Sequence, residues 1–171
     1  LEQAQKGSYP HFMLKEIHEQ AFTIEKAAQQ PRADLRQATA MLKKAKGVFF
    51  IGCGTSYHAC VSTAYTFARV AGIHVNVVLG SEFRHYEKFL TNNTLVAALS
   101  QSGETADLLD AVRTAKDKGC KTLSVVNVMG STLTRLADLN LMMNAGPEIC
   151  VLSTKSYTSQ LTILMLLAYS V

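Results

Sequence analysis

The sequence predicts an α/β protein, a three-layer α/β/α sandwich around a five-stranded parallel sheet. Apolar runs of strand length recur along the chain, and a polar turn and a helical pattern follow each of them. The runs are nearly continuous in Val, Leu, Ile, Phe and Met, which is typical of strands that are covered on both faces. Because strands and helices alternate, the crossover rules place helices on both sides of the sheet.

The elements follow in order along the chain. The five predicted strands are GVFFIGCG (47–54), HVNVVLG (74–80), TLVAALS (94–100), TLSVVNV (122–128) and LNLMMNA (139–145). Helical patterns lie between them at 56–70, 104–118 and 133–137, and another begins at Thr154. Two helices, at about 12–29 and 33–45, precede the first strand and are separated by Pro31. We therefore expect a helical lead-in over residues 1–46, packed on a single domain over residues 47–171.

The composition excludes several classes of protein. With 171 residues the chain can bury one ordinary core, and its net charge of +4 is mild. The basic residues are spread out, and the one cluster, Lys43, Lys44 and Lys46, suits a solvated helix end better than a nucleic-acid surface. The longest apolar run, 161–171, is shorter than the roughly 18–20 residues that a membrane span needs. The N-terminal stretch is polar, unlike a signal peptide.

The cysteines and the chain end complete this picture. The four cysteines show no metal-binding or redox spacing and are expected to be free thiols, so we expect a cytoplasmic protein without membrane or nucleic-acid partners. Val171 stops inside an apolar helical pattern that has no cap, which predicts a piece of a longer chain. Apolar surface left by that last helix should pair two copies of the chain into a homodimer.

The stretch ALSQSGETADLL, residues 98–109, is the strongest candidate for a binding loop. It follows the third strand and opens a helix, where unpaired N–H groups and the helix dipole attract anions. Ser100, Ser102 and Thr105 add hydroxyl donors, Gln101 adds an amide, and Gly103 allows close approach to the backbone. Capping by Ser102 alone would explain one hydroxyl and not three, so we predict a phosphate site.

The loop after the first strand, Gly52-Cys53-Gly54-Thr55-Ser56, is the second candidate. It begins like a dinucleotide-binding fingerprint, but Tyr57 stands where the third glycine belongs, and the next strand ends without an acidic residue. Thr55 and Ser56 could offer hydroxyls to a small polyol or could simply cap the following helix.

The histidines and remaining cysteines suggest no metal or nucleophilic centre. His11 and His18 lie seven residues apart with no carboxylate partner of metal-ligand spacing, and His58 and His85 suit a surface or supporting position. We find neither a Ser-His-Asp nor a Cys-His pattern, and we expect no metal and no cofactor.

Several segments together resemble a known family. They are SQSGETADLLDA (100–111), GCGTSYHA (52–59), NAGPEICVLSTKSYTSQ (144–160), HFMLKEIHEQ (11–20) and SEFR (81–84). In order and spacing they are similar to the first sugar isomerase (SIS) domain of the glutamine–fructose-6-phosphate aminotransferases. That resemblance implies the SIS fold and a bound hexose phosphate, fructose 6-phosphate or glucosamine 6-phosphate. In that family the complete enzyme converts fructose 6-phosphate and glutamine to glucosamine 6-phosphate and glutamate.

The resemblance also implies roles for individual residues. Ser100, Gln101, Ser102 and Thr105 would hold the phosphate, whereas Cys53, Thr55, Ser56, Val151 and Ser153 would line the sugar. Lys155 would be structural, and Cys150 and Leu152, which differ from common residues of the family, would lie near the sugar. The implied catalytic groups belong to a second SIS domain and a C-terminal tail, and ammonia comes from a glutaminase domain. This chain would therefore bind the sugar with no catalytic residue of its own, with those domains as its partners.

Two alternatives stay open at this point. One is an SIS deaminase or isomerase without a glutaminase domain, which shares the phosphate loop. The other is a regulatory module in which an SIS domain senses a sugar phosphate and tunes a DNA-binding partner, although no helix-turn-helix segment is visible. The KEIHEQ and STKSYTSQ segments favour the aminotransferase.

Overall fold

Five parallel strands form one sheet at the centre of the molecule. The computed structural model describes residues 5–171, so the first four residues of the predicted lead-in lie outside the described residues. The strands are β1 (Gly47–Gly52), β2 (Val75–Leu79), β3 (Thr94–Ser100), β4 (Lys121–Val126) and β5 (Leu139–Met142). Their order is β2-β1-β3-β4-β5, and every neighbouring pair is parallel. The predicted five-stranded parallel sheet is confirmed.

Both faces of the sheet are buried, which explains the continuous apolar runs. Val48 and Phe50 of β1 belong to one hydrophobic core, and Phe49 and Ile51 belong to the core on the opposite face. Because successive side chains of a strand point to opposite faces, a strand with two buried faces has no polar position to alternate with.

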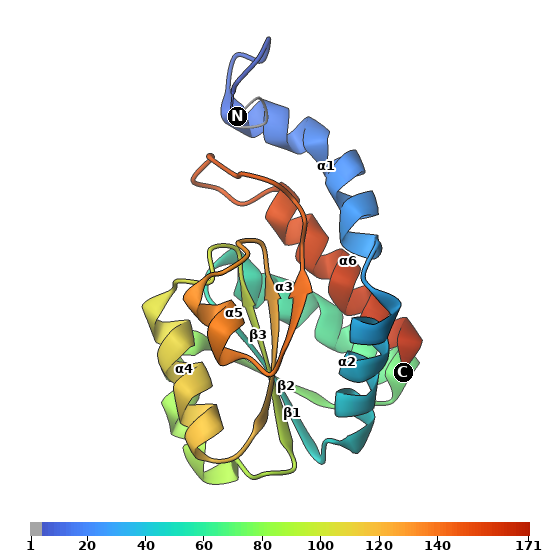
Figure 1. Ribbon diagram of the computed structural model, residues 1–171, viewed down its shortest axis with the longest axis vertical. Coiled ribbons are helices and arrows are strands. Elements are labelled where there is room, and N and C mark those ends of the chain that lie inside the picture. The colour runs from blue at the N-terminus through green and yellow to red at the C-terminus, as the bar shows by residue number, and fades with distance from the viewer. Residues whose placement is uncertain (1–4) are drawn as a thin grey trace.

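Helices cover the two faces (Figure 1). On one face lie α2 (Arg32–Lys44), α3 (Thr55–Thr66) and α6 (Lys155–Ser170), and α3 continues into a π-helical turn, η2 (Phe67–Ala71). On the other face lie α4 (Ala106–Asp117), α5 (Thr132–Leu136) and a 3₁₀ segment, η3 (Gly80–Phe89). The three-layer α/β/α prediction is therefore confirmed.

Helix α1 (Phe12–Ala28) extends beyond the sandwich, where it lies along α6 (Figure 1). Its C-terminal end enters the core through Ala27, which is fully buried. The buried amine of Lys155 in α6 pairs with Glu19 of α1, with Nζ and Oε2 2.6 Å apart. This part of the lead-in is thus fixed to the last helix of the chain.

Several predicted boundaries were wrong by a few residues. The first strand ends at Gly52 instead of residue 54, because Gly54 takes a positive φ of 55° and turns the chain. Helix α4 begins at Ala106 instead of residue 104. The segment η3 was not predicted; its Phe83 packs edge-on against Phe49 of β1, with ring centroids 5.8 Å apart, a contact that local periodicity does not encode.

Most apolar side chains of the last helix are buried or half-buried, so the expectation that this helix leaves apolar surface exposed was wrong for them. The four residues of α6 that enter the core are Ile163, Leu164, Leu167 and Ala168. Helix α6 is covered by α1, α2 and α3, which turns a continuous apolar pattern into a buried helix. Among residues 5–171, no helix is both long and apolar enough to cross a membrane.

Candidate functional site

The sheet has one switch point, between β1 and β3. From β1 the chain crosses to β2 on one side, and from β3 it continues to β4 and β5 on the other. In open parallel sheets, ligands bind at the carboxyl ends of the strands at such a point. The loops after β1 and β3 meet there, and the segment before α6 approaches them.

These three segments enclose a cleft of about 370 Å³. The structure brings together all nine residues that the sequence predicted for the site. The lining consists of Cys53, Gly54, Thr55, Ser56, Leu99, Ser100, Gln101, Ser102, Thr105, Val151, Leu152 and Ser153. Leu152 lines the cleft as the resemblance implied, whereas Cys150 is not part of the lining.

Hydroxyl groups in the cleft are arranged as donors. The Oγ atom of Ser100 accepts a hydrogen bond from the N–H of Gly103 at 2.9 Å, and the Oγ atom of Ser102 accepts from the N–H of Glu104 at 3.2 Å. Neither hydroxyl proton has an acceptor among residues 5–171, so each is left to donate to a ligand. The cleft therefore presents O–H donors toward a negatively charged or polar ligand.

Two helix N-termini open onto the same cleft. Gly54 precedes α3 and Thr105 precedes α4, and neither helix has a side-chain cap. Capping therefore does not occupy the hydroxyls of Thr55, Ser56 or Ser102, which was the alternative explanation for them. Uncapped N–H groups and two helix dipoles create a region that favours an anion.

Two glycines are required by close backbone packing. Gly103 has a φ of 68°, and a Cβ atom built there would overlap the side chains of Ser131 and Val126. A Cβ on Gly52 would lie 2.8 Å from the backbone carbonyl carbon of Ser56. No larger residue fits at either position without displacing the loops that form the cleft.

The sequence placed Glu104 in the first turn of a helix, whereas the structure places it before the helix begins. It precedes α4, and its Oε1 accepts a hydrogen bond of 2.7 Å from the N–H of Thr132 at the start of α5. That hydrogen bond lowers the pKa of Glu104. Because the N–H of Leu133 also donates to the carbonyl of Gly103, the loop after β3 is fixed to α5 from two sides.

Cys53 is half-buried at the carboxyl end of β1. Burial raises the pKa of its thiol, and the negative charge of Asp107 raises it further against opposing hydrogen bonds from the backbone of Gly80 and Ser81. The side chain is therefore a neutral thiol near pH 7 and not a thiolate nucleophile.

Two residues outside the predicted set support the lining. Gln160 is buried in α6, and its Nε2 donates to the Oγ of Ser56 at 2.9 Å, which leaves the hydroxyl proton of Ser56 free to donate. Glu148 accepts hydrogen bonds from the N–H of Thr154 at 2.9 Å and from the Oγ of Ser153 at 3.1 Å. Glu148 lies six residues before Thr154, which is outside the capping-box spacing that a sequence search would detect.

Lys155 is buried away from the cleft. Its ion pair with Glu19 joins α6 to α1, in keeping with the structural role expected for it. Among residues 5–171, no three His, Cys, Asp or Glu side chains gather closely enough to hold a metal ion.

Comparisons with known proteins agree with this geometry. A family model described as the SIS domain matches residues 41–170. The glutamine–fructose-6-phosphate aminotransferase [isomerizing] of Thermococcus kodakarensis is 48% identical over 169 residues, which are 98% of this chain and 28% of that protein. The C-terminal domain of glucosamine-fructose-6-phosphate aminotransferase from Francisella tularensis superposes with a TM-score of 0.87 at 32% identity. That match covers 96% of this chain and 49% of the other.

A further similar solved structure is that of a protein from E. coli CFT073. It superposes with a TM-score of 0.77 at 25% identity and covers 91% of this chain and 86% of the other. The chain spans about 28% of the length of the aminotransferases that it matches. The family model covers most of the chain, and its relatives share the sheet observed here, so the chain belongs to the SIS domain family.

Proposed function

We propose that this chain binds a hexose phosphate, fructose 6-phosphate or glucosamine 6-phosphate, in the cleft at the switch point. One observation carries the proposal: free hydroxyl protons and two uncapped helix N-termini face a single cleft. Two such N-termini favour an anion, and the hydroxyls match a sugar phosphate in size and polarity. The names of the aminotransferase relatives support the same substrate.

The phosphate lies over the loop after β3 in this proposal. Its ligands are Ser100, Gln101, Ser102 and Thr105, together with the first N–H groups of α4. Since no Lys or Arg of residues 5–171 lines the cleft, the phosphate charge is balanced by hydrogen bonds and helix dipoles. The sugar extends toward the other side of the cleft, against Cys53, Thr55, Ser56, Val151 and Ser153.

The parent protein in this proposal is a glutamine–fructose-6-phosphate transaminase (isomerizing). Such an enzyme turns fructose 6-phosphate and glutamine into glucosamine 6-phosphate and glutamate. Identity of 48% over 98% of the chain favours it over a deaminase or isomerase without a glutaminase domain and over a regulatory module. The glutaminase domain and a second SIS domain are the partners within that chain, and the setting is the cytoplasm.

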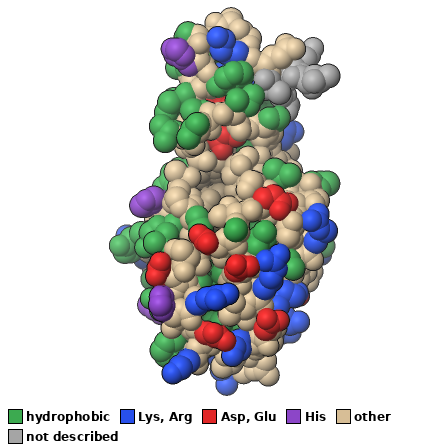
Figure 2. All heavy atoms as spheres, turned by 90° about the vertical axis from the view of Figure 1, so that its left-hand side faces the viewer, with side chains coloured by type: hydrophobic (Ala, Val, Ile, Leu, Met, Phe, Trp, Pro, Cys, Tyr) green, Lys and Arg blue, Asp and Glu red, His purple; other side chains and the backbone are tan. Residues whose placement is uncertain are grey.

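We also propose that residues 1–46 act as a lead-in to the SIS domain over residues 47–171 and help to form a homodimer. Five apolar side chains of α1 are more than a third exposed: Met13, Leu14, Ile17, Phe22 and Ile24. Apolar side chains gather at the upper end of the molecule in Figure 2, whereas charged ones cover its lower part. Such a surface suits a second protein surface better than water.

The test of sugar-phosphate binding is calorimetry with fructose 6-phosphate on the protein and on the Ser102→Ala variant. Loss of a hydrogen bond to a charged phosphate is expected to weaken binding by roughly 1.5–3 kcal/mol. Fructose without its phosphate should bind far more weakly than fructose 6-phosphate.

The matched control is Ser62→Ala, which removes an exposed hydroxyl from the outer part of α3. It should leave the affinity for fructose 6-phosphate unchanged. Equal affinity of the Ser102→Ala variant and the unmodified protein would refute the phosphate assignment.

A further inference from the structure

The segment 147–154, which we call the cover loop, brings Val151, Leu152 and Ser153 to the cleft. It has no helix or strand, and Val151 and Leu152 are 99% and 59% exposed, so packing does not hold these two side chains in place. Within the described residues, the backbone N–H groups of this loop that donate a hydrogen bond are those of Ile149, Cys150 and Thr154. All three donate to the carboxyl group of a glutamate.

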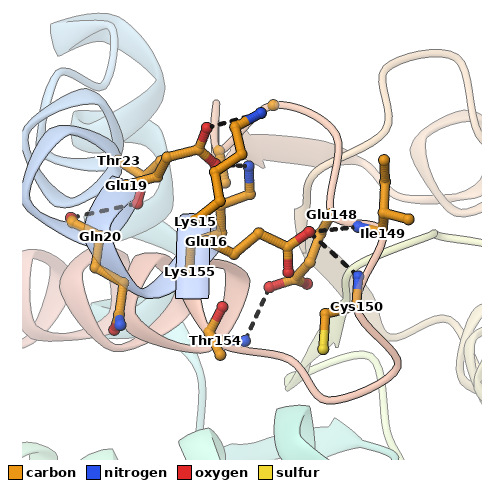
Figure 3. Close-up of polar contacts among 12 residues, drawn as sticks. Lys15, Glu16, Glu19, Gln20, Thr23, Glu148, Ile149, Cys150, Thr154 and Lys155 are labelled. Carbon is orange, nitrogen blue, oxygen red and sulfur yellow. Dashed lines mark hydrogen bonds and ion pairs between the residues drawn. The ribbon is translucent and has the colours of Figure 1, made fainter. Parts of the chain in front are cut away.

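The two glutamates come from different parts of the chain. Glu148 lies in the cover loop and binds the N–H of Thr154, at the start of α6. Glu16 lies in α1, and its Oε1 accepts from the N–H of Ile149 at 2.7 Å and from the N–H of Cys150 at 3.2 Å. Figure 3 shows Glu16 reaching from α1 across to these two residues, while Glu148 lies beneath them and faces Thr154.

The side chain of Glu16 is buried, so its carboxyl group contacts the protein and not solvent. Its side chain is only 1% exposed, although 133 residues separate it from Ile149 along the chain. The neighbouring ion pair between Glu19 and Lys155 holds α1 against α6, and Lys15 lies 3.4 Å from Glu19 on the same helix. The acceptor oxygen is thus carried by a helix whose own position is fixed, which is how a loop without helix or strand is held in one geometry.

We infer that Glu16 is a positioning residue for the sugar-phosphate site: it holds the cover loop so that Val151 and Ser153 face the sugar. The inference rests on the proposed function for its ligand, whereas the contact itself is independent of any ligand. Helix α1 therefore supports the binding site although none of its residues lines the cleft.

The position of the cover loop predicts a split between two ligands. Inorganic phosphate needs only the loop after β3, whereas fructose 6-phosphate also needs the sugar side of the cleft. In the Glu16→Leu variant, fructose 6-phosphate should bind about tenfold or more weakly, because two hydrogen bonds that order the loop are lost. The affinity for inorganic phosphate should change by less than about twofold, and amide exchange should accelerate at Ile149 and Cys150.

Two conservative variants and a control sharpen the test. Glu16→Gln keeps an oxygen that can accept from the N–H groups of Ile149 and Cys150, and its amide nitrogen replaces Oε2, which has no partner among the described residues. This variant should therefore bind fructose 6-phosphate like the unmodified protein. Glu16→Asp withdraws the acceptor by one methylene and should reproduce the split even if Glu16→Leu does not fold. Glu25→Leu makes the same change at an exposed position of α1 and should bind both ligands normally.

The outcomes separate this inference from the proposed function. Equal weakening of both ligands, with faster exchange throughout the chain, would show that Glu16 supports only overall stability and would overturn the inference. Unchanged exchange at Ile149 and Cys150 in both Glu16→Leu and Glu16→Asp would overturn it as well. If the unmodified protein fails to bind fructose 6-phosphate while the local exchange still responds to Glu16, the proposed ligand is wrong and the positioning of the loop stands.

Discussion

Hydrogen bonds from neighbouring groups determine which atoms of the cleft residues can still bind a ligand. The hydroxyls of Ser100 and Ser102 each accept a hydrogen bond from a backbone N–H, and that of Ser56 accepts one from Gln160. All three hydroxyl protons can therefore donate to a ligand. A hydroxyl that must donate discriminates in favour of phosphate and sugar oxygens and against donor groups. The polarity of the cleft is thus set without a charged side chain among the described residues that line it.

Cys53 provides a chemical probe of the proposed site. Alkylation requires the thiolate, and since burial raises the pKa of this thiol above its ordinary value of 9.0, iodoacetamide should modify it slowly at pH 7. The rate should rise as the pH increases toward and beyond that pKa. Fructose 6-phosphate should slow the reaction by covering the thiol.

Cys150 is the internal control, because it is also half-buried but does not line the cleft. Mass spectrometry of the modified peptides distinguishes the two residues. Protection of both cysteines to the same extent, or of neither, would contradict the placement of the sugar beside Cys53.

At the scale of the elements, short tertiary contacts align the strand ends. Asp138, just before β5, accepts hydrogen bonds at Oδ2 from the N–H of Thr122 at 2.8 Å and from the Oγ1 of Thr122 at 3.1 Å. Its Oδ1 pairs with Lys116 of α4 at 3.0 Å. One carboxylate therefore joins β4, β5 and α4 at the amino-terminal ends of the strands, which lie at the end of the sheet opposite the cleft.

Asp138 should make stability depend on pH in acid. Burial alone would raise its pKa, but the hydrogen bonds from Thr122 and Lys116 outweigh burial and lower it below the ordinary value of 3.8. The stabilisation is therefore complete above about pH 5 and is lost as the pH falls through the lowered pKa of the folded state. Asp138→Asn should cost about 1–2 kcal/mol of unfolding free energy at pH 7 and progressively less in acid.

Urea denaturation at several pH values measures this difference. Asp110→Asn serves as the control, because Asp110 forms an exposed pair with Arg113 on α4 and should cost little at any pH. A constant difference between Asp138→Asn and the unmodified protein from pH 7 down to about pH 2 would contradict the argument.

At the scale of the whole molecule, binding and chemistry are expected to be separate. Isomerisation of a ketose phosphate needs a base that moves a proton between neighbouring carbons. Among the described residues that line the cleft, Cys53 is the only one with a titratable side chain. Glu104 is held by Thr132, and Glu148 is occupied at the start of α6. Both of these carboxyl groups therefore already have a structural role.

The protein of residues 1–171 should accordingly bind the sugar without converting it. We expect neither glucosamine 6-phosphate from glutamine and fructose 6-phosphate nor hexose-phosphate isomerisation above background in a coupled assay. Turnover that disappears on mutation of Glu104 or Glu148 would show that the catalytic group lies in this chain.

The exposed face of α1 predicts self-association. Light scattering should give a mass near twice 18.7 kDa, and Phe22→Glu should shift it toward the monomer, because Phe22 is 53% exposed among other apolar side chains. Phe89→Glu, at a 69% exposed position of η3, is the control and should leave the mass unchanged. A monomer at high concentration would contradict the homodimer.

The sequence alone determined the sheet and the two loops, after β1 and β3, that form most of the cleft lining, whereas Val151 and Ser153 were expected only from the family resemblance. A strand such as β3 is recognisable because both of its faces are buried. Ser100 ends this strand, and Gln101 to Thr105 follow at its carboxyl end, where parallel strands bring their loops together. Composition and order along the chain encode these features locally. The same reasoning made Thr55 and Ser56 after β1 candidates, with helix capping as the alternative role of their hydroxyls, and both line the cleft.

Only the tertiary structure decided which distant groups hold the site in place. Glu16 reaches a loop more than 130 residues away, Gln160 reaches Ser56 across 104 residues, and Glu104 binds α5 instead of capping its own helix. No local pattern marks such partners, since any buried polar group must find a hydrogen bond and the partner depends on how the layers pack. The burial of α6 and the exposure of α1 follow from the same packing. Helix α6 lies against α1, α2 and α3 and sends Ile163, Leu164 and Leu167 into the core, whereas α1 extends beyond the sandwich.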